Sequence, residues 1–126
     1  MTSVNPWLFV ASLAALAACV THLLLGGRAF ARPLLGSDLR SPVKHTHYYC
    51  WHLVTAALAL MAVAFAWAAA APEAREAAML GAAMAVAFLI VNVVQNIALR
   101  LSFAKHPQGG FFAIISALAL MGLAHG

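Results

Sequence analysis

Charged side chains are scarce in this chain of 126 residues, of which they make up only 8%. A soluble domain carries about 25% charged residues. The acidic residues number three in all, namely Asp38, Glu73 and Glu76. Such a composition cannot cover a globular domain with a water-facing surface, so the chain is not expected to be a soluble protein.

Motifs that identify a reaction are also missing. The two cysteines, Cys19 and Cys50, lie in different apolar runs and form no CxxC pair. We therefore expect free thiols and exclude the four-span thiol oxidases, which need paired cysteines. The chain lacks HExxH and the histidine boxes of membrane desaturases, and it has no carboxylate in any apolar run, unlike small multidrug antiporters. No basic residue precedes Cys19, so its lipoprotein-like surroundings lack the start of a signal peptide.

Hydrophobic residues, by contrast, make up 65% of the chain and gather in four runs. A membrane-spanning helix needs roughly 17–25 apolar residues. Three runs meet this length, and the fourth does so if it begins at Gln108 and continues almost to the last residue. We predict an all-α, polytopic membrane protein, a four-transmembrane-helix bundle forming one domain over residues 1–126. The expected spans are about 7–25, 47–71, 75–99 and 108–125.

The basic residues orient this predicted bundle. Lysine and arginine in short loops mark the cytoplasmic side of a membrane protein. The segments after the first and third spans are rich in them, and the segment after the second is not. The residues concerned are Arg28, Arg32, Arg40, Lys44, Arg100 and Lys105. Both termini are therefore expected on the outer (periplasmic) side of a bacterial inner membrane. The net charge of +4 would then contact lipid headgroups and not nucleic acid.

Helix boundaries can be predicted from caps and breakers. Asn5-Pro6 and Ser41-Pro42 are typical of a cap followed by proline in the first helical turn. Pro72, followed by acidic residues, is expected to start the third helix. Gly26-Gly27 is expected to end the first helix and to open a loop that runs to Ser41.

Polar side chains are predicted to converge near the cytoplasmic ends of the spans. In the first span, Ala11, Ala15, Ala18, His22 and Gly26 recur at helical spacing, which favours a face turned toward neighbouring helices. The polar residues of the second and third spans also follow helical spacing. They are His45, Tyr48, His52 and Thr55 in the second and Asn92, Gln95 and Asn96 in the third. Polar groups inside a membrane span indicate a functional site, here a pocket open to the cytoplasm.

Three ligands suit such a pocket. A transition metal would be held by His22, His45, His52 and His106, with Cys50 as a further donor. A haem b would take His22 and His52 as axial ligands from two helices. A quinone-like molecule or a lipid headgroup would be hydrogen-bonded by the cofactor-binding set of His22, His52, Asn92 and Asn96.

The same residues also have a purely structural interpretation. His22 would then bind Asn92 or a backbone carbonyl, and Tyr48, Tyr49 and Trp51 would form an aromatic belt at the membrane surface. Two functions therefore remain open. The chain is either a small membrane protein that binds a metal, haem or quinone through histidines, or a non-catalytic accessory or assembly subunit of a larger membrane complex. Its alanine-rich faces also suit a homo-oligomer. No residue set decides whether it is an enzyme.

Overall fold

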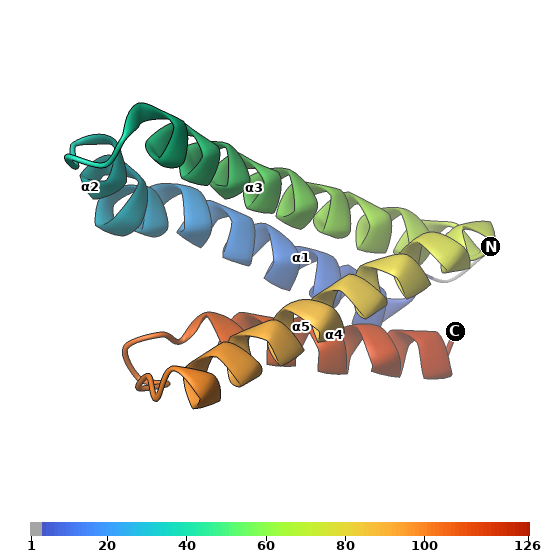
Figure 1. Ribbon diagram of the computed structural model, residues 1–126. Coiled ribbons are helices and arrows are strands. Elements are labelled where there is room, and N and C mark those ends of the chain that lie inside the picture. Colours follow the sequence, from blue (N-terminus) through green and yellow to red (C-terminus); the bar gives the residue numbers. More distant parts are fainter. Residues whose placement is uncertain (1–3) are drawn as a thin grey trace.

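The computed structural model describes residues 4–126, and within that range it contains helices and no strand. Figure 1 shows the helices as two pairs that lie close together at one end and diverge toward the other. In chain order the elements are the α-helix α1 (Pro6–Thr21), the π-helix η1 (His22–Ala31), α2 (Arg32–Leu35), α3 (Ser41–Ala70), the 3₁₀ turn η2 (Pro72–Ala74), α4 (Arg75–Ala98) and α5 (Gln108–Ala124).

The first helix is longer than the sequence indicated. α1, η1 and α2 form one uninterrupted helical segment, Pro6–Leu35. The prediction that Gly26-Gly27 ends the helix is therefore wrong, and the turn into α3 takes up only residues 36–40. Gly26 instead allows the ring of Trp51 to pack closely against the helix. A Cβ atom added there would lie 2.6 Å from Cη2 of Trp51, whereas one added at Gly27 would meet no atom within 4 Å.

The predicted helix starts agree with the structure to within one residue. The side-chain oxygen of Asn5 accepts hydrogen bonds from the backbone N–H groups of Trp7 and Leu8, as expected of an N-cap. α3 begins at Ser41 itself, so Arg40 occupies the capping position that we had assigned to Ser41. The third long helix begins at Pro72 through the 3₁₀ turn, with Glu73 in that turn.

Three helical segments are long and apolar enough to cross a membrane, namely Pro6–Leu35, Ser41–Ala70 and Pro72–Ala98. α5 is equally apolar but has 17 residues. At about 1.5 Å per residue it is roughly 26 Å long, slightly less than a hydrocarbon core of about 30 Å. The all-helical prediction is confirmed, and the fourth span remains a prediction.

Hydrogen bonds close the bundle at the end that carries Asn5 and the α3–α4 turn. The backbone N–H of Asn5 donates to the Ala69 carbonyl at 2.9 Å, and its side-chain N–H donates to the Gly122 carbonyl at 2.9 Å. Arg75 donates to the Leu123 carbonyl at 2.7 Å. This end, which we call the closed end, therefore joins α1, α3, α4 and α5 (Figure 1).

Small residues make the pairs pack tightly near the closed end. α1 packs against both α3 and α5, α4 packs against α5, and α3 and α4 are in looser contact. Ala11 and Ala15 are fully buried, as the predicted small-residue face required. The Ser12 hydroxyl adds a buried hydrogen bond of 2.8 Å to the Ala62 carbonyl. Toward the other end, the open end, the α1/α3 pair separates from the α4/α5 pair, and the gap contains the site.

Candidate functional site

The helix pairs diverge toward the open end, and we call the space between them there the wedge. Two adjoining cavities lie in this wedge. The larger, which we call the apolar cavity, has a volume of about 580 Å³ and lies between η1, α3 and the start of α5. The smaller, which we call the amide cavity, has a volume of about 260 Å³ and lies between α3, α4 and α5. Val54, Gln108 and Phe112 line both, so the two cavities meet at these residues.

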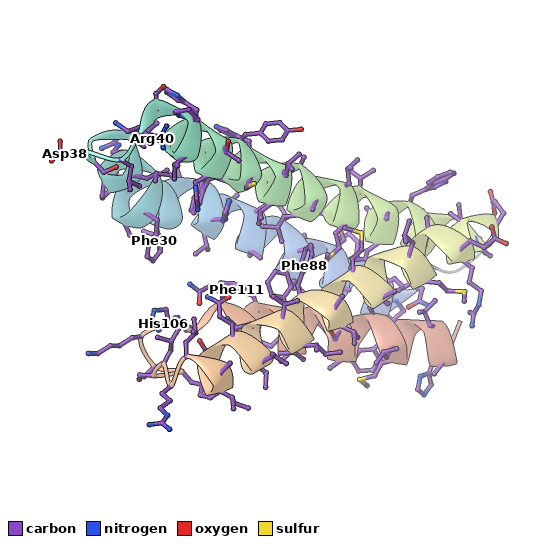
Figure 2. All side chains as sticks on the ribbon, in the orientation of Figure 1. Phe30, Asp38, Arg40, Phe88, His106 and Phe111 are labelled. Atoms are coloured by element: carbon purple, nitrogen blue, oxygen red, sulfur yellow. The ribbon has the colours of Figure 1, made fainter. Side chains whose placement is uncertain are left out.

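Phenylalanines from both helix pairs border the wedge. Figure 2 shows Phe30 and Phe111 on opposite sides of its opening and Phe88 deeper between the pairs. Phe30 and Phe111 line the apolar cavity, and Phe88 lines the amide cavity. The Phe88 ring meets Phe112 edge to face, with centroids 5.2 Å apart. Most of the wedge wall is therefore apolar or aromatic.

His22 lies on the α1/α3 side of the apolar cavity, where η1 begins. Its ring stacks on Trp51, with centroids 3.8 Å apart and planes inclined by 18°. Its Nε2 atom lies 3.2 Å from the Trp51 carbonyl oxygen. Because a carbonyl only accepts hydrogen bonds, Nε2 carries the hydrogen, and in the neutral ring Nδ1 is left as an acceptor. The histidine thus couples η1 to α3 and retains one acceptor nitrogen.

The π-helical stretch coincides with the apolar cavity. It covers ten residues, His22–Ala31, although most π-helical segments are single-turn bulges, often at functional sites. Its His22, Gly26 and Phe30 line the cavity. Trp51 covers Gly26 and contacts Phe30 at a centroid distance of 6.5 Å. The indole therefore joins η1 to α3 along this wall.

Amides from α4 form the polar wall of the amide cavity. Asn96 is buried, and its Nδ2 lies 3.4 Å from Oδ1 of Asn92 and 3.5 Å from the carbonyl oxygen of His106. Gly109 packs directly on Oδ1 of Asn92. His106 also lines the cavity, and its Nδ1 donates to the Ser102 carbonyl at 3.2 Å. The loop between α4 and α5 is thereby fixed against the end of α4.

The predicted metal ligands do not come together. His22 lies in the apolar cavity and His106 in the amide cavity. His45 is exposed, with its Nδ1 3.1 Å from the Ser41 hydroxyl, and His52 is exposed beside Tyr48 of its own helix. Among residues 4–126, no group of three or more His, Cys, Asp or Glu side chains could hold a metal ion. The predicted metal set therefore has no support.

The haem arrangement is also without support. It requires His22 and His52 to face each other, but the residue that covers the His22 ring is Trp51. The His52 ring instead meets Tyr48 edge to face at a centroid distance of 4.6 Å. Of the predicted cofactor-binding set, the structure assigns His22 to one cavity and Asn92 and Asn96 to the other, and His52 lines neither.

Sequence reasoning missed several lining residues. Lys105 comes from the loop before α5, and Gln108 and Phe111 come from the first turn of α5; none of the three was among the predicted site residues. Trp51 had been assigned to an aromatic belt. The signal for Trp51 was the glycine pair in the preceding helix, since a glycine in a membrane helix often marks a close approach. Lys105 is the one charged side chain that lines either cavity in the described part of the chain.

No family model, curated protein or solved structure matches this chain.

Proposed function

We propose that this chain is a four-span protein of the bacterial inner membrane whose wedge binds a lipid-soluble amphiphile, a molecule with a polar head and an apolar chain. In this proposal both termini are periplasmic, and the open end of the wedge lies in the cytoplasmic leaflet. α5 completes the bundle as the fourth span, and this helix of 17 mostly apolar residues packs on α1 and α4.

The apolar cavity is the observation that carries the proposal. Small-molecule sites are concave, mostly apolar spaces of about 300–1,000 Å³ with a few well-placed polar groups. The apolar cavity has a volume of about 580 Å³, and its polar side chains include His22, Lys105 and Gln108. An amphiphile can place its chain along this apolar wall, and Gln108, which lines both cavities, offers a polar group to its head.

The distribution of charge supports the orientation. Arg28, Arg32, Arg40 and Lys44 lie in η1, α2, the α2–α3 turn and the start of α3, all at the open end, where Figure 2 labels Arg40. Glu73 and Glu76 lie at the closed end, at the start of α4. Loops that carry basic residues stay on the cytoplasmic side of the membrane. The same residues also favour contact with anionic lipid headgroups on that side.

A cavity-filling pair of variants tests the proposal. Ala29 lines the apolar cavity, whereas Ala17 is exposed on the same continuous helix and lines neither cavity. The protein is reconstituted in neutral phosphatidylcholine nanodiscs, and the probes are diazirine-labelled forms of a two-isoprene quinone and of the ringless two-isoprene alcohol. Competition with each unlabelled compound gives its dissociation constant.

We expect saturable crosslinking to peptides that line the wedge. Ala29→Phe should weaken binding by about tenfold or more, and the matched variant Ala17→Phe should leave it unchanged. Absence of saturable binding of both compounds, or equal binding to both variants, would refute the proposed function and would leave the accessory-subunit alternative.

A further inference from the structure

The amide cavity has a chemistry different from that of the apolar cavity. Its polar wall consists mainly of carboxamides, from Asn92, Gln95, Asn96 and Gln108, together with His106. No carboxylate or ammonium group lines it. A carboxamide offers two N–H donors and one carbonyl acceptor without charge. The cavity is therefore suited to a neutral head that presents both carbonyl and hydroxyl oxygens.

Several of the amide groups that line the cavity make no hydrogen bond to another side chain that the structure describes. Asn96 Nδ2 lies near Asn92 and the His106 carbonyl, but within residues 4–126 the side-chain amides of Gln95 and Gln108 have no hydrogen-bond partner. Both side chains are exposed at the open end, so their amides are accessible to a ligand in the cavity that they line. A bound head group would give these amides hydrogen-bond partners.

The size and the aromatic wall of the amide cavity select a single ring. An apolar cavity of about 150 Å³ is known to bind benzene in another protein. At about 260 Å³, the amide cavity accommodates one ring with oxygen and methyl substituents. The edge-to-face pair Phe88–Phe112 forms part of its wall, and aromatic rings favour such contacts with a further ring.

The junction of the cavities provides a path for a chain attached to that ring. Val54, Gln108 and Phe112 belong to both cavities, so a substituent that leaves the amide cavity passes these residues and continues into the apolar cavity. There it meets Leu58, Phe111 and the Trp51 indole. Lys105 lines only the apolar cavity, so the structure places no cation beside the ring.

From this geometry we infer that the amphiphile is an isoprenoid quinone, with its ring in the amide cavity and its chain in the apolar cavity. The inference rests on the proposed function and deepens it. The oxidised ring accepts hydrogen bonds from the amide N–H groups, and the reduced ring donates its hydroxyls to the amide carbonyls. The amide wall thus accepts both forms of the same ring.

The test compares the two probes in variants of Gln95. Gln95→Met retains the length of the side chain and removes its amide, and Val94→Met is the matched control because Val94 is exposed and lines neither cavity. Trp7→Phe and Trp67→Phe leave Trp51 as the single indole, so quenching of its fluorescence by the quinone gives a second measure of binding. Lys105→Gln tests whether the head instead lies beside Lys105 in the apolar cavity.

We expect the quinone to bind about tenfold more tightly than the ringless alcohol. Gln95→Met should remove most of this difference, whereas Val94→Met and Lys105→Gln should preserve it. Equal binding of quinone and alcohol, with no effect of Gln95→Met, would overturn the quinone assignment and leave the proposed function standing. Loss of quinone binding in Lys105→Gln would place the head beside Lys105 in the apolar cavity and would equally overturn the assignment of the ring to the amide cavity. Absence of binding by either probe would refute both proposals.

Discussion

Gly26 and Gly27 are adjacent in the sequence but have opposite surroundings. The Trp51 ring occupies the space beside Gly26, and the space beside Gly27 is open. A glycine in a helix costs roughly 0.5–1 kcal/mol relative to alanine. Gly27→Ala should therefore raise the free energy of unfolding by about that amount. Gly26→Ala should lower it, because the added methyl group displaces the indole from η1 and from His22.

Unfolding in mixed micelles, followed by circular dichroism, measures both variants. The fluorescence of Trp51 should shift in Gly26→Ala and stay constant in Gly27→Ala. Equal stabilisation by the two substitutions would show that the indole does not depend on Gly26.

At the scale of single residues, the sequence predicted part of the site. Periodicity and small neighbours correctly indicated that Ala11, Ala15 and Ala18 are buried. The prediction that His52 shares the site with His22 has no support, because the inward face of α3 carries Trp51 and Leu58. We expected polar residues of the spans to face the protein interior, but His52 is exposed on the half of α3 nearer the basic open end, where headgroups and water can solvate it.

Among the helices, the contact between α4 and α5 depends on Gly109. This residue packs on the side-chain oxygen of Asn92, and the next residue, Gly110, has no neighbouring atom within 4 Å of an added Cβ. Gly109→Ala should therefore force the start of α5 away from α4, reduce the free energy of unfolding by about 1 kcal/mol or more, and weaken ligand binding in the amide cavity. Gly110→Ala, which adds a methyl group in open space, should not lower the free energy of unfolding and should leave ligand binding unchanged.

The same unfolding and probe-binding measurements apply to this pair. A loss of stability in Gly110→Ala equal to that in Gly109→Ala would indicate a general sensitivity of the loop and not the specific contact with Asn92.

The starts of the helices were more predictable than their ends. Asn5, Ser41 and Pro72 are local signals, and each acts within a few residues of the helix that it begins. The end of the first helix was misjudged because Gly26-Gly27 was interpreted as it would be in water. In a bilayer, continuing the helix keeps backbone groups hydrogen-bonded. Glycine is also common inside membrane helices, so the pair does not determine an end.

For the whole molecule, the decisive prediction concerns orientation. Asp38 lies in the turn between α2 and α3 at the open end, and Glu73 lies in η2 at the closed end. In a background with Cys19→Ala and Cys50→Ala, single cysteines at these positions report which side each end faces. Glu73→Cys should react with a membrane-impermeant maleimide in intact spheroplasts, whereas Asp38→Cys should react only after the membrane is permeabilised.

Labelling in the reverse order would place the open end in the periplasm and contradict the proposed orientation. The orientation of the bundle is predicted from the sequence alone, because each loop carries its own basic or acidic residues. The wedge was beyond sequence reasoning, since it depends on the angle between two helix pairs, and no local residue pattern encodes that angle.

At the closed end, the side-chain hydrogen bond from Asn5 to the Gly122 carbonyl connects the two helix pairs, and the α3–α4 turn joins them there as well. Any rotation of one pair relative to the other therefore has its axis near that end, and the displacement grows along the helices. α3 has 30 residues, which makes it roughly 45 Å long. A rotation of about 5° would then move its far end by roughly 4 Å, close to the thickness of an aromatic ring. A small change in interhelical angle is thus sufficient to admit or release a flat molecule from the surrounding lipid.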